Sequence, residues 1–199
     1  MERSYMHILV QVLIILSCAF LTPLAHADEI TDTIDKSINY YELGELSNAT
    51  TQLGYAAKLI SQKQVHIIAR LFPEPLAGWT SRKAEGQSTG VGLAMNMGVM
   101  SERQYQNGNN EILTITIHQN SPMIQAIKPI LTNSSIVAKR LGRSITVNDQ
   151  QAFIQDKNGT KKLTLLDESK LLIIETKGEE VLEAEMMQYA RAIDLNQIK

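Results

Sequence analysis

Three methionines within six residues form the part of this sequence best suited to binding a metal. Met95, Met97 and Met100 follow a glycine-rich stretch, and thioether sulfur is a ligand that Cu(I) prefers. On a strand, Met95 and Met97 lie on one face and Met100 on the other, so a copper site that uses all three needs a bulge, or a further ligand must join, either Met123 or His118. The competing interpretation, which we favour, is that these methionines fill the core, a common role of this residue.

Histidine-based catalysis has little support in the sequence. Of the four histidines, His7 and His26 lie in an N-terminal segment that we expect to be removed, which leaves His66 and His118. The chain contains neither the Gly-x-Ser-x-Gly motif of a serine hydrolase nor the His-Glu-x-x-His motif of a zinc protease. We therefore predict no catalytic residue and do not expect an enzyme.

The segment Leu-Phe-Pro-Glu-Pro-Leu-Ala-Gly-Trp at residues 71–79 is predicted to be a rigid connector. Its two prolines prevent a helix from continuing and push the residues before them into extended conformations. We expect Trp79 to anchor the connector to the body of the protein, since large aromatic side chains are mostly buried. The weaker alternative is that Trp79 and Glu74 form a recognition site.

Residues 28–71 are predicted to form a pair of helices. In the first, apolar residues recur at helical spacing, and Gly44 ends it. The apolar positions of the second recur in the same way. These positions are Ile30, Ile34, Ile38 and Tyr41 in the first helix and Leu53, Ala56, Ile60, Ile67 and Leu71 in the second.

Beyond Trp79 the apolar period changes from that of helices to that of strands. Leu113, Ile115 and Ile117 alternate with polar residues, as in a strand with one buried face. Strands are predicted at about 92–105, 113–118, 143–149, 151–157, 162–167 and 171–176. Helices are predicted from Pro122 to Leu131, with a kink at Pro129, and over about 179–193. This order predicts an α+β fold, an antiparallel sheet flanked by helices and preceded by a helical hairpin.

The first 27 residues have the pattern of a secretory signal peptide. A short start carrying Arg3 is followed by an apolar run and then by Ala25-His26-Ala27, the small-x-small pattern at which signal peptides are cleaved. We expect cleavage after Ala27 and a periplasmic or secreted location. The alternative is a lipid anchor on Cys18. The predicted domains are the signal peptide 1–27, a helical hairpin 28–71 and an α+β sandwich domain 72–199.

Composition argues against several classes of function. Cys18 is the only cysteine, so the processed chain can form neither a disulfide nor a cysteine-based metal site. The formal net charge is −2 and aromatic residues make up 5% of the chain, so nucleic-acid binding is not expected. No apolar run after Ala27 is long enough to cross a membrane. We predict no cofactor and expect the partner to be another protein of the envelope.

Several motifs together resemble a family of uncharacterised secreted bacterial proteins. They are the Leu-x-Pro-Glu-Pro-Leu-x-Gly-Trp segment at 71–79, Ser101-x-Arg103-x-Tyr105, Ser121-Pro122 and Ala192-Ile193-Asp194. The element order after Trp79 is similar to the PsbP/DcrB-like α/β/α sandwich, whose members are mostly binding or assembly proteins. This resemblance implies a non-catalytic envelope protein that binds a partner or assists an assembly. A small-ligand or copper carrier using Met95 and Met97 is the alternative, and an enzyme comes third.

Overall fold

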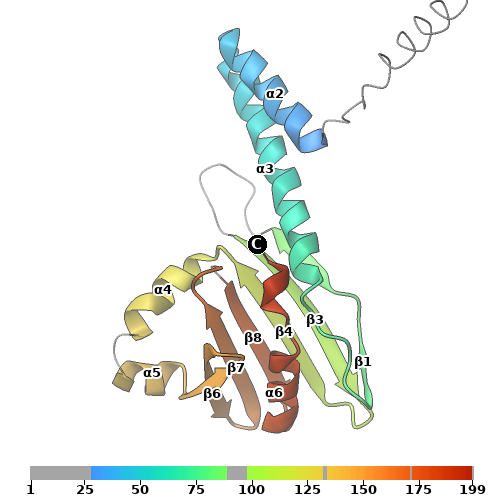
Figure 1. Ribbon diagram of the computed structural model, residues 1–199, viewed down its shortest axis with the longest axis vertical. Coiled ribbons are helices and arrows are strands. Elements are labelled where there is room, and N and C mark those ends of the chain that lie inside the picture. The colour runs from blue at the N-terminus through green and yellow to red at the C-terminus, as the bar shows by residue number, and fades with distance from the viewer. Residues whose placement is uncertain (1–27, 89–97, 132–133, 171, 199) are drawn as a thin grey trace, which may run out of the picture.

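A helical hairpin stands on one end of an antiparallel sheet in the computed structural model (Figure 1). The structure describes residues 28–88, 98–131, 134–170 and 172–198. Eight strands form one sheet in the order β1-β3-β4-β8-β7-β6-β5, and β2 also pairs with β3. All pairings are antiparallel, which confirms the predicted α+β fold.

The strands that the sequence marks most clearly are those joined by short turns. The sheet consists of β1 Trp79–Ser81, β2 Glu85–Ser88, β3 Val99–Asn107, β4 Ile112–Gln119, β5 Arg143–Val147, β6 Gln150–Lys157, β7 Thr160–Asp167 and β8 Leu172–Glu179. The predicted strand at 92–105 corresponds to β3, although residues 89–97 lie outside the described part of the chain. The two short strands β1 and β2 are not predicted, because neither has an apolar alternation.

Helices cover both faces of the sheet, and the alternation of its strands shows which face each helix meets. Leu165 and Leu172 belong to the main core, beneath helix α6 (Glu183–Arg191). The neighbouring Leu166 and Ile173 point the other way, because successive side chains alternate. They form a second cluster with two isoleucines of helix α4 (Pro122–Leu131), namely Ile124 and Ile127.

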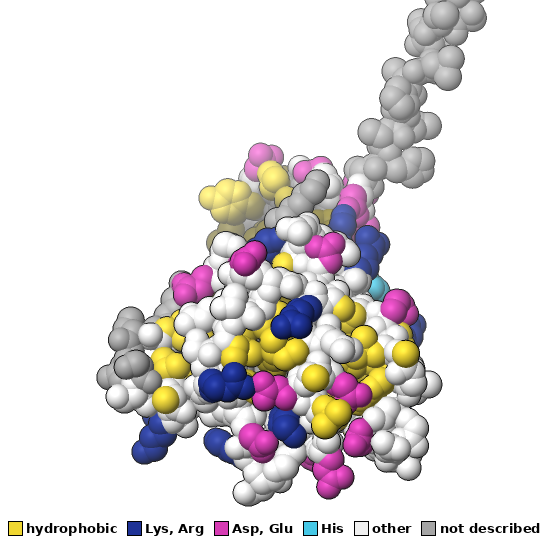
Figure 2. All heavy atoms as spheres, turned by 60° about the horizontal axis from the view of Figure 1, so that its bottom comes forward, with side chains coloured by type: hydrophobic (Ala, Val, Ile, Leu, Met, Phe, Trp, Pro, Cys, Tyr) yellow, Lys and Arg dark blue, Asp and Glu magenta, His cyan; other side chains and the backbone are white. Residues whose placement is uncertain are grey.

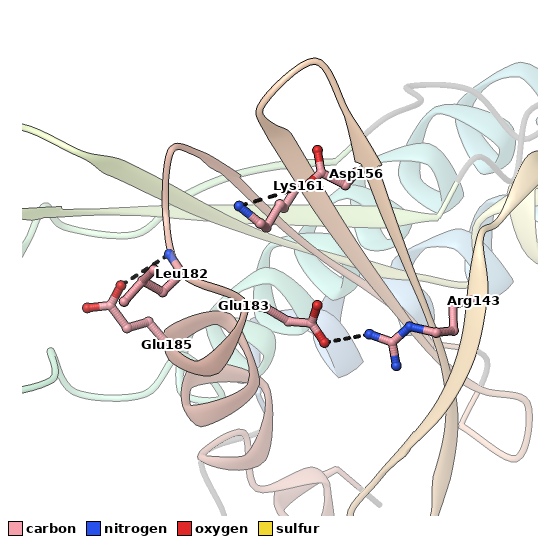
Figure 3. A network of polar contacts seen from close by, with 6 residues as sticks. All are labelled: Arg143, Asp156, Lys161, Leu182, Glu183 and Glu185. Carbon is pink, nitrogen blue, oxygen red and sulfur yellow. Dashed lines mark hydrogen bonds and ion pairs between the residues drawn. The ribbon is translucent and has the colours of Figure 1, made fainter.

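The last helix begins later than predicted. Glu179 is the last residue of β8 rather than the first of a helix, because the alternation of buried and exposed residues continues past Thr176 to the buried Gly178. The chain then turns at Glu180, whose φ is +59°, and α6 begins at Glu183. Figure 3 shows the start of this helix, where Arg143 of β5 lies 2.6 Å from the Glu183 carboxylate.

The region after α4 contains a helix that the sequence analysis does not predict. Pro129 lies inside α4, and helix α5 follows at Ser134–Arg140. The ribbon diagram places both helices beside the β6–β8 side of the sheet, while the hairpin rises from the other side (Figure 1). The hairpin consists of α2 (Glu29–Glu42) and α3 (Leu46–Ala69), as predicted.

Candidate interaction surface

Small side chains form the joint between the two helices of the hairpin. The buried residues of α2 are Thr33 and Ser37, and those of α3 that face them are Ala49 and Ala56. The Ser37 hydroxyl donates a hydrogen bond to the carbonyl oxygen of Ala49 at 2.9 Å, across the joint. The residues that are fully buried at the joint are therefore small, whereas Ile30 and Ile34 beside it are half-buried.

Helix α3 carries four of its large apolar residues in an exposed row. They recur every seven residues, which places them along one side of the helix. The exposed fractions of their side chains fall steadily from the tip of the hairpin towards its base. They are 60% at Leu46, 43% at Leu53, 41% at Ile60 and 38% at Ile67.

Helix α2 carries a second row on the same side of the hairpin. Each residue of a helix is rotated by about 100° from the one before it, so Ile34 and Ile38 lie to one side of the joint residues Thr33 and Ser37. In α3, Leu46 and Leu53 are rotated in the same sense from the joint residues Ala49 and Ala56. Because the two helices are antiparallel, this rotation places the α3 row on the same side of the hairpin as the α2 row. We define the hairpin face as Ile30, Ile34, Ile38 and Tyr41 of α2 and Leu46, Leu53, Ile60 and Ile67 of α3.

Polar contacts between the two helices mark the side of the hairpin opposite to this face. There, the Tyr55 hydroxyl donates a hydrogen bond to Glu29 at 2.9 Å, and Lys63 pairs with Asp28 at 3.0 Å. The apolar rows therefore do not lie where the two helices already contact each other. In Figure 2 the hairpin points away from the viewer, and hydrophobic side chains are visible at its far end.

The hairpin face carries no charge along α3. The positions that lie between its four large residues are Thr50, Ala57 and Gln64. The charges of the hairpin lie elsewhere and differ between the helices. Helix α2 contains four acidic residues and one lysine, whereas α3 contains two lysines and no acidic residue: Glu29, Asp32, Asp35, Lys36 and Glu42 against Lys58 and Lys63.

The base of the hairpin is packed firmly on the sheet. Val65 of α3 contacts Gly86 of β2 so closely that a Cβ on Gly86 would lie 2.1 Å from the Val65 Cγ1. The connector that follows α3 is buried at Leu71, Phe72 and Pro73. The Tyr105 hydroxyl of β3 donates a hydrogen bond to the Pro73 carbonyl oxygen at 2.8 Å.

Trp79 anchors the end of the connector, which confirms that part of the sequence analysis. Its side chain is 7% exposed, and its indole N–H donates to the Glu185 carboxylate at 3.2 Å. The ring meets Tyr189 edge-on, with 5.7 Å between centroids. Glu74 is exposed. A binding role for Trp79 and Glu74 stays a prediction, and so little of the indole is exposed that Trp79 could contribute only a narrow edge.

The proposed copper ligands divide between described and undescribed residues. Met95 and Met97 lie outside the described residues. Met100 on β3 and His118 on β4 are direct cross-strand partners, so their side chains share a face of the sheet and lie close together. On the other side of His118 stands Ile173 of β8. The sheet therefore brings together one thioether and one imidazole of the four predicted ligands.

The surroundings of His118 favour its neutral form. Burial between apolar neighbours lowers the pKa of His118 below its ordinary value of 6.5. The carboxylate of Glu175 opposes this shift, and the ammonium group of Lys162 adds to it. Those two groups pair with each other at 2.5 Å. A neutral imidazole is the form that can bind a metal.

Other candidate sites are poorer in converging groups. His66 is exposed on α3. In the described ranges, His, Cys, Asp and Glu side chains nowhere form a group of three that could hold a metal ion. An open hollow of about 310 Å³ lies between the loops at 109–112 and 158–160, beside Glu179 and Glu180, and its lining is mostly amide and carboxylate.

None of the helices in the described part of the chain is both long enough and apolar enough to cross a membrane.

The sequence analysis predicted the α2 row and three residues of the α3 row from their period, namely Leu53, Ile60 and Ile67. It did not include Leu46, it placed the buried Ala56 among the same positions, and it did not show that the rows are largely exposed. The sequence did contain an indication of this, because the positions beside each row are occupied by small residues that can form the joint, namely Thr33, Ser37, Ala49 and Ala56.

Comparison of the chain with protein-family models, curated proteins and solved structures found no match.

Proposed function

We propose that this chain is a non-catalytic protein of the bacterial envelope that binds a protein partner through the hairpin face. The observation that carries the proposal is that six large apolar side chains of the hairpin face are exposed and its other two, Ile30 and Ile34, are half-buried, while the fully buried joint between the helices is formed by small residues. Contiguous apolar surface of this kind on a soluble element marks an interaction site. An apolar side chain gains little by facing water, so the arrangement is expected where a partner covers it.

The charges beside the hairpin face favour a protein over a lipid surface. Helices that lie on membranes carry Lys and Arg along their polar side, where they contact anionic headgroups. Here the helix that supplies half of the face is mainly acidic, with Asp35 and Glu42 beside the apolar row. An anionic membrane would repel this flank, whereas a protein groove of matching shape can accept it.

The location in the envelope rests on the N-terminal sequence. The apolar run and the Ala25-His26-Ala27 pattern are those of a secretory signal. Mass spectrometry of the chain purified after expression of its full-length sequence tests this, because cleavage leaves Asp28 as the first residue. An intact Met1, or a lipid attached at Cys18, would contradict cleavage after Ala27.

A photo-crosslinking experiment in cells tests partner binding. A photoreactive amino acid replaces Leu53 on the hairpin face, and in a control chain it replaces Gln62, which is exposed on the same helix but off the face. We expect one reproducible protein adduct from position 53 and none from position 62. Equal adducts from both positions, or none from either, would overturn the proposal.

A copper(I) carrier is the second candidate function, and the cross-strand pairing of Met100 with His118 favours it. A competition assay with a Cu(I) chelator tests it on the purified chain. The affinity should fall at least about tenfold when Met95, Met97 and Met100 are changed to leucine, since thioethers are the soft ligands. A weaker or absent loss would rule out this candidate, and His118→Gln tests the imidazole separately.

A further inference from the structure

We infer that the partner of the hairpin face is a second copy of this chain, and that the two hairpins form a four-helix bundle with acidic α2 over basic α3. The inference rests on the proposed function, because it names the occupant of the same surface. Three observations carry it: the spacing of the apolar rows, the area they cover and the distribution of charge between the helices.

The row on α3 has the spacing used by helices that pack against other helices. Leu46, Leu53, Ile60 and Ile67 stand at intervals of seven residues, the repeat that keeps an apolar seam facing a neighbouring helix. The α2 row runs beside it, so the hairpin offers two adjacent seams. The two apolar rows of one hairpin can therefore pack against the two rows of a second copy. In a two-fold dimer the same patch is used on both subunits.

The area of the hairpin face is that of a weak, reversible dimer. In the dimer only the part of α3 that lies beside α2 has a helix opposite it, so each of the four helices contributes about 21 Å, the length of the 14-residue α2. With about 10 Å between axes, two such faces would bury roughly 800–1,000 Å² in total. Stable specific interfaces bury about 1,200–2,000 Å², and weak, transient ones bury less.

Charge selects between two ways of pairing the hairpins. A two-fold axis along the hairpin places α2 of one copy over α3 of the other, whereas an axis across it places like helices together. The charges on the outer flanks of the face are Asp35 and Glu42 on α2 and Lys58 on α3, since Glu29 and Lys63 lie on the opposite side of the hairpin. Pairing α2 with α2 would bring Asp35 and Glu42 of one copy against those of the other. Opposite charges across an interface favour association, and like charges oppose it. The axis along the hairpin is therefore favoured, and it brings both tips to the same end of the dimer.

Sedimentation velocity tests whether the face mediates dimerisation. The chain is expressed from its full-length sequence, purified in its processed form and measured from micromolar to near-millimolar concentration. We expect reversible dimers. Ile60→Glu should raise the dissociation constant at least about a hundredfold, because each copy would bring an unpaired carboxylate into the interface.

The matched control is Gln62→Glu, which adds the same charge two residues away and off the face. We expect it to change the dissociation constant by less than about threefold, since exposed charges contribute little. Circular dichroism checks that both variants are folded, and Leu53→Lys repeats the test with the opposite charge. A wild-type chain that stays monomeric at all concentrations, or an Ile60→Glu chain that dimerises like its control, would overturn the inference.

Cysteine crosslinking tests the arrangement of the helices. In a Cys18→Ser background the chain has no other cysteine, so Leu43→Cys places a single thiol at the tip of each hairpin. A short bifunctional maleimide should join the two copies through position 43, and it should not do so for Gln62→Cys, which lies off the face. Dimers that fail to crosslink at position 43 would overturn the arrangement with α2 over α3.

The two proposals can fail separately. If the purified chain is monomeric while the photoreactive group at position 53 captures a different protein, the inference of a second copy fails and the proposed function stands. If position 53 captures only this chain, and sedimentation shows dimers that Ile60→Glu disrupts, self-association stands without any other partner. Binding of the purified chain to phosphatidylglycerol vesicles, lost in Ile60→Glu but not in Gln62→Glu, would contradict both proposals.

Discussion

Two glycines show how one residue type has opposite effects according to what surrounds it. Gly86 of β2 faces Val65, and an added Cβ would lie 2.1 Å from the Val65 Cγ1. Gly54 lies inside α3, with nothing within 4 Å of an added Cβ. The first glycine is required for helix and strand to approach each other, whereas the second only weakens a helix.

We therefore predict opposite changes in the free energy of unfolding for the two alanine variants. Gly86→Ala should destabilise the protein by about 1–3 kcal/mol, because Val65 must move to avoid overpacking. Gly54→Ala should stabilise it by about 0.5–1 kcal/mol through helix propensity. Urea unfolding of both variants measures this, and a stable Gly86→Ala protein would show that the base of the hairpin is loosely packed.

His118 should make stability depend on pH. Its pKa in the folded chain lies below the 6.5 expected when the chain is unfolded, so the unfolded state takes up the proton first as the pH falls. The folded state therefore loses stability below pH 6.5, down to the pKa of the folded state, at a slope no greater than about 1.4 kcal/mol per pH unit. Above pH 6.5 the group contributes no such dependence.

The variant His118→Gln isolates this contribution. The difference in unfolding free energy between wild type and variant should be constant above pH 6.5 and should shift in favour of the variant below it. His66→Gln, at an exposed position of α3, controls for the loss of one imidazole. A difference that does not change with pH would contradict the buried setting of His118.

At the scale of elements, the hairpin differs from an ordinary pair of helices in the kind of residue that stabilises the contact between the two helices. Its joint is formed by small side chains such as Ala56, which is 3% exposed, while Leu53 is 43% exposed. Stability should therefore respond more to the alanine than to the leucine. In a usual amphipathic hairpin, the large apolar residues lie between the helices and the opposite holds.

Two substitutions measure this difference, at a protein concentration low enough for the chain to be monomeric. Ala56→Leu should cost about 1–3 kcal/mol, because the added side chain forces the helices apart. Leu53→Ala should cost less than about 1 kcal/mol, against 2–5 kcal/mol for a buried leucine. If Leu53→Ala proves the more harmful of the two, the large residues support the fold, and the case for a docking surface is lost.

The local sequence pattern predicted the elements whose residues show the period of a helix or a strand within a short stretch of the chain. The alternation of Leu113, Ile115 and Ile117 predicted β4, and the helical spacing of the isoleucines predicted α2. Strands β1 and β2 were not predicted, because they exist through pairing with the distant β3. Such pairing is set by the tertiary structure and leaves little trace in the local sequence.

The predicted site was recognised only in part. A row of apolar residues every three or four positions shows that a helix has an apolar side, but period alone does not say what will cover that side. The answer depended on Ser37 and Ala49 meeting across the joint, which is a contact between two helices. The pairing of Met100 with His118 likewise depended on a strand register that neither residue specifies alone.

For the molecule as a whole, self-association would couple stability to concentration. Dimerisation stabilises only the folded state, so the unfolding equilibrium shifts with protein concentration. We predict that the thermal midpoint of the wild-type chain rises as concentration increases, and that the midpoint of Ile60→Glu does not. Differential scanning calorimetry over a hundredfold range measures this, and equal behaviour of the two chains would argue against the dimer.

The contact of Val65 with Gly86, together with the buried connector, also fixes the direction of the hairpin relative to the sheet. Helix α3 has 24 residues and is therefore about 36 Å long. A small change of angle at its base, where it contacts the sheet, gives a large displacement at its tip. A tilt of about 10° at the base would move the tip sideways by about 6 Å, more than half of the roughly 8–10 Å that separates the axes of packed helices. Such a swing would put Leu46 out of step with any row it should meet. Rigidity at the base is therefore what allows a surface at the tip to be specific.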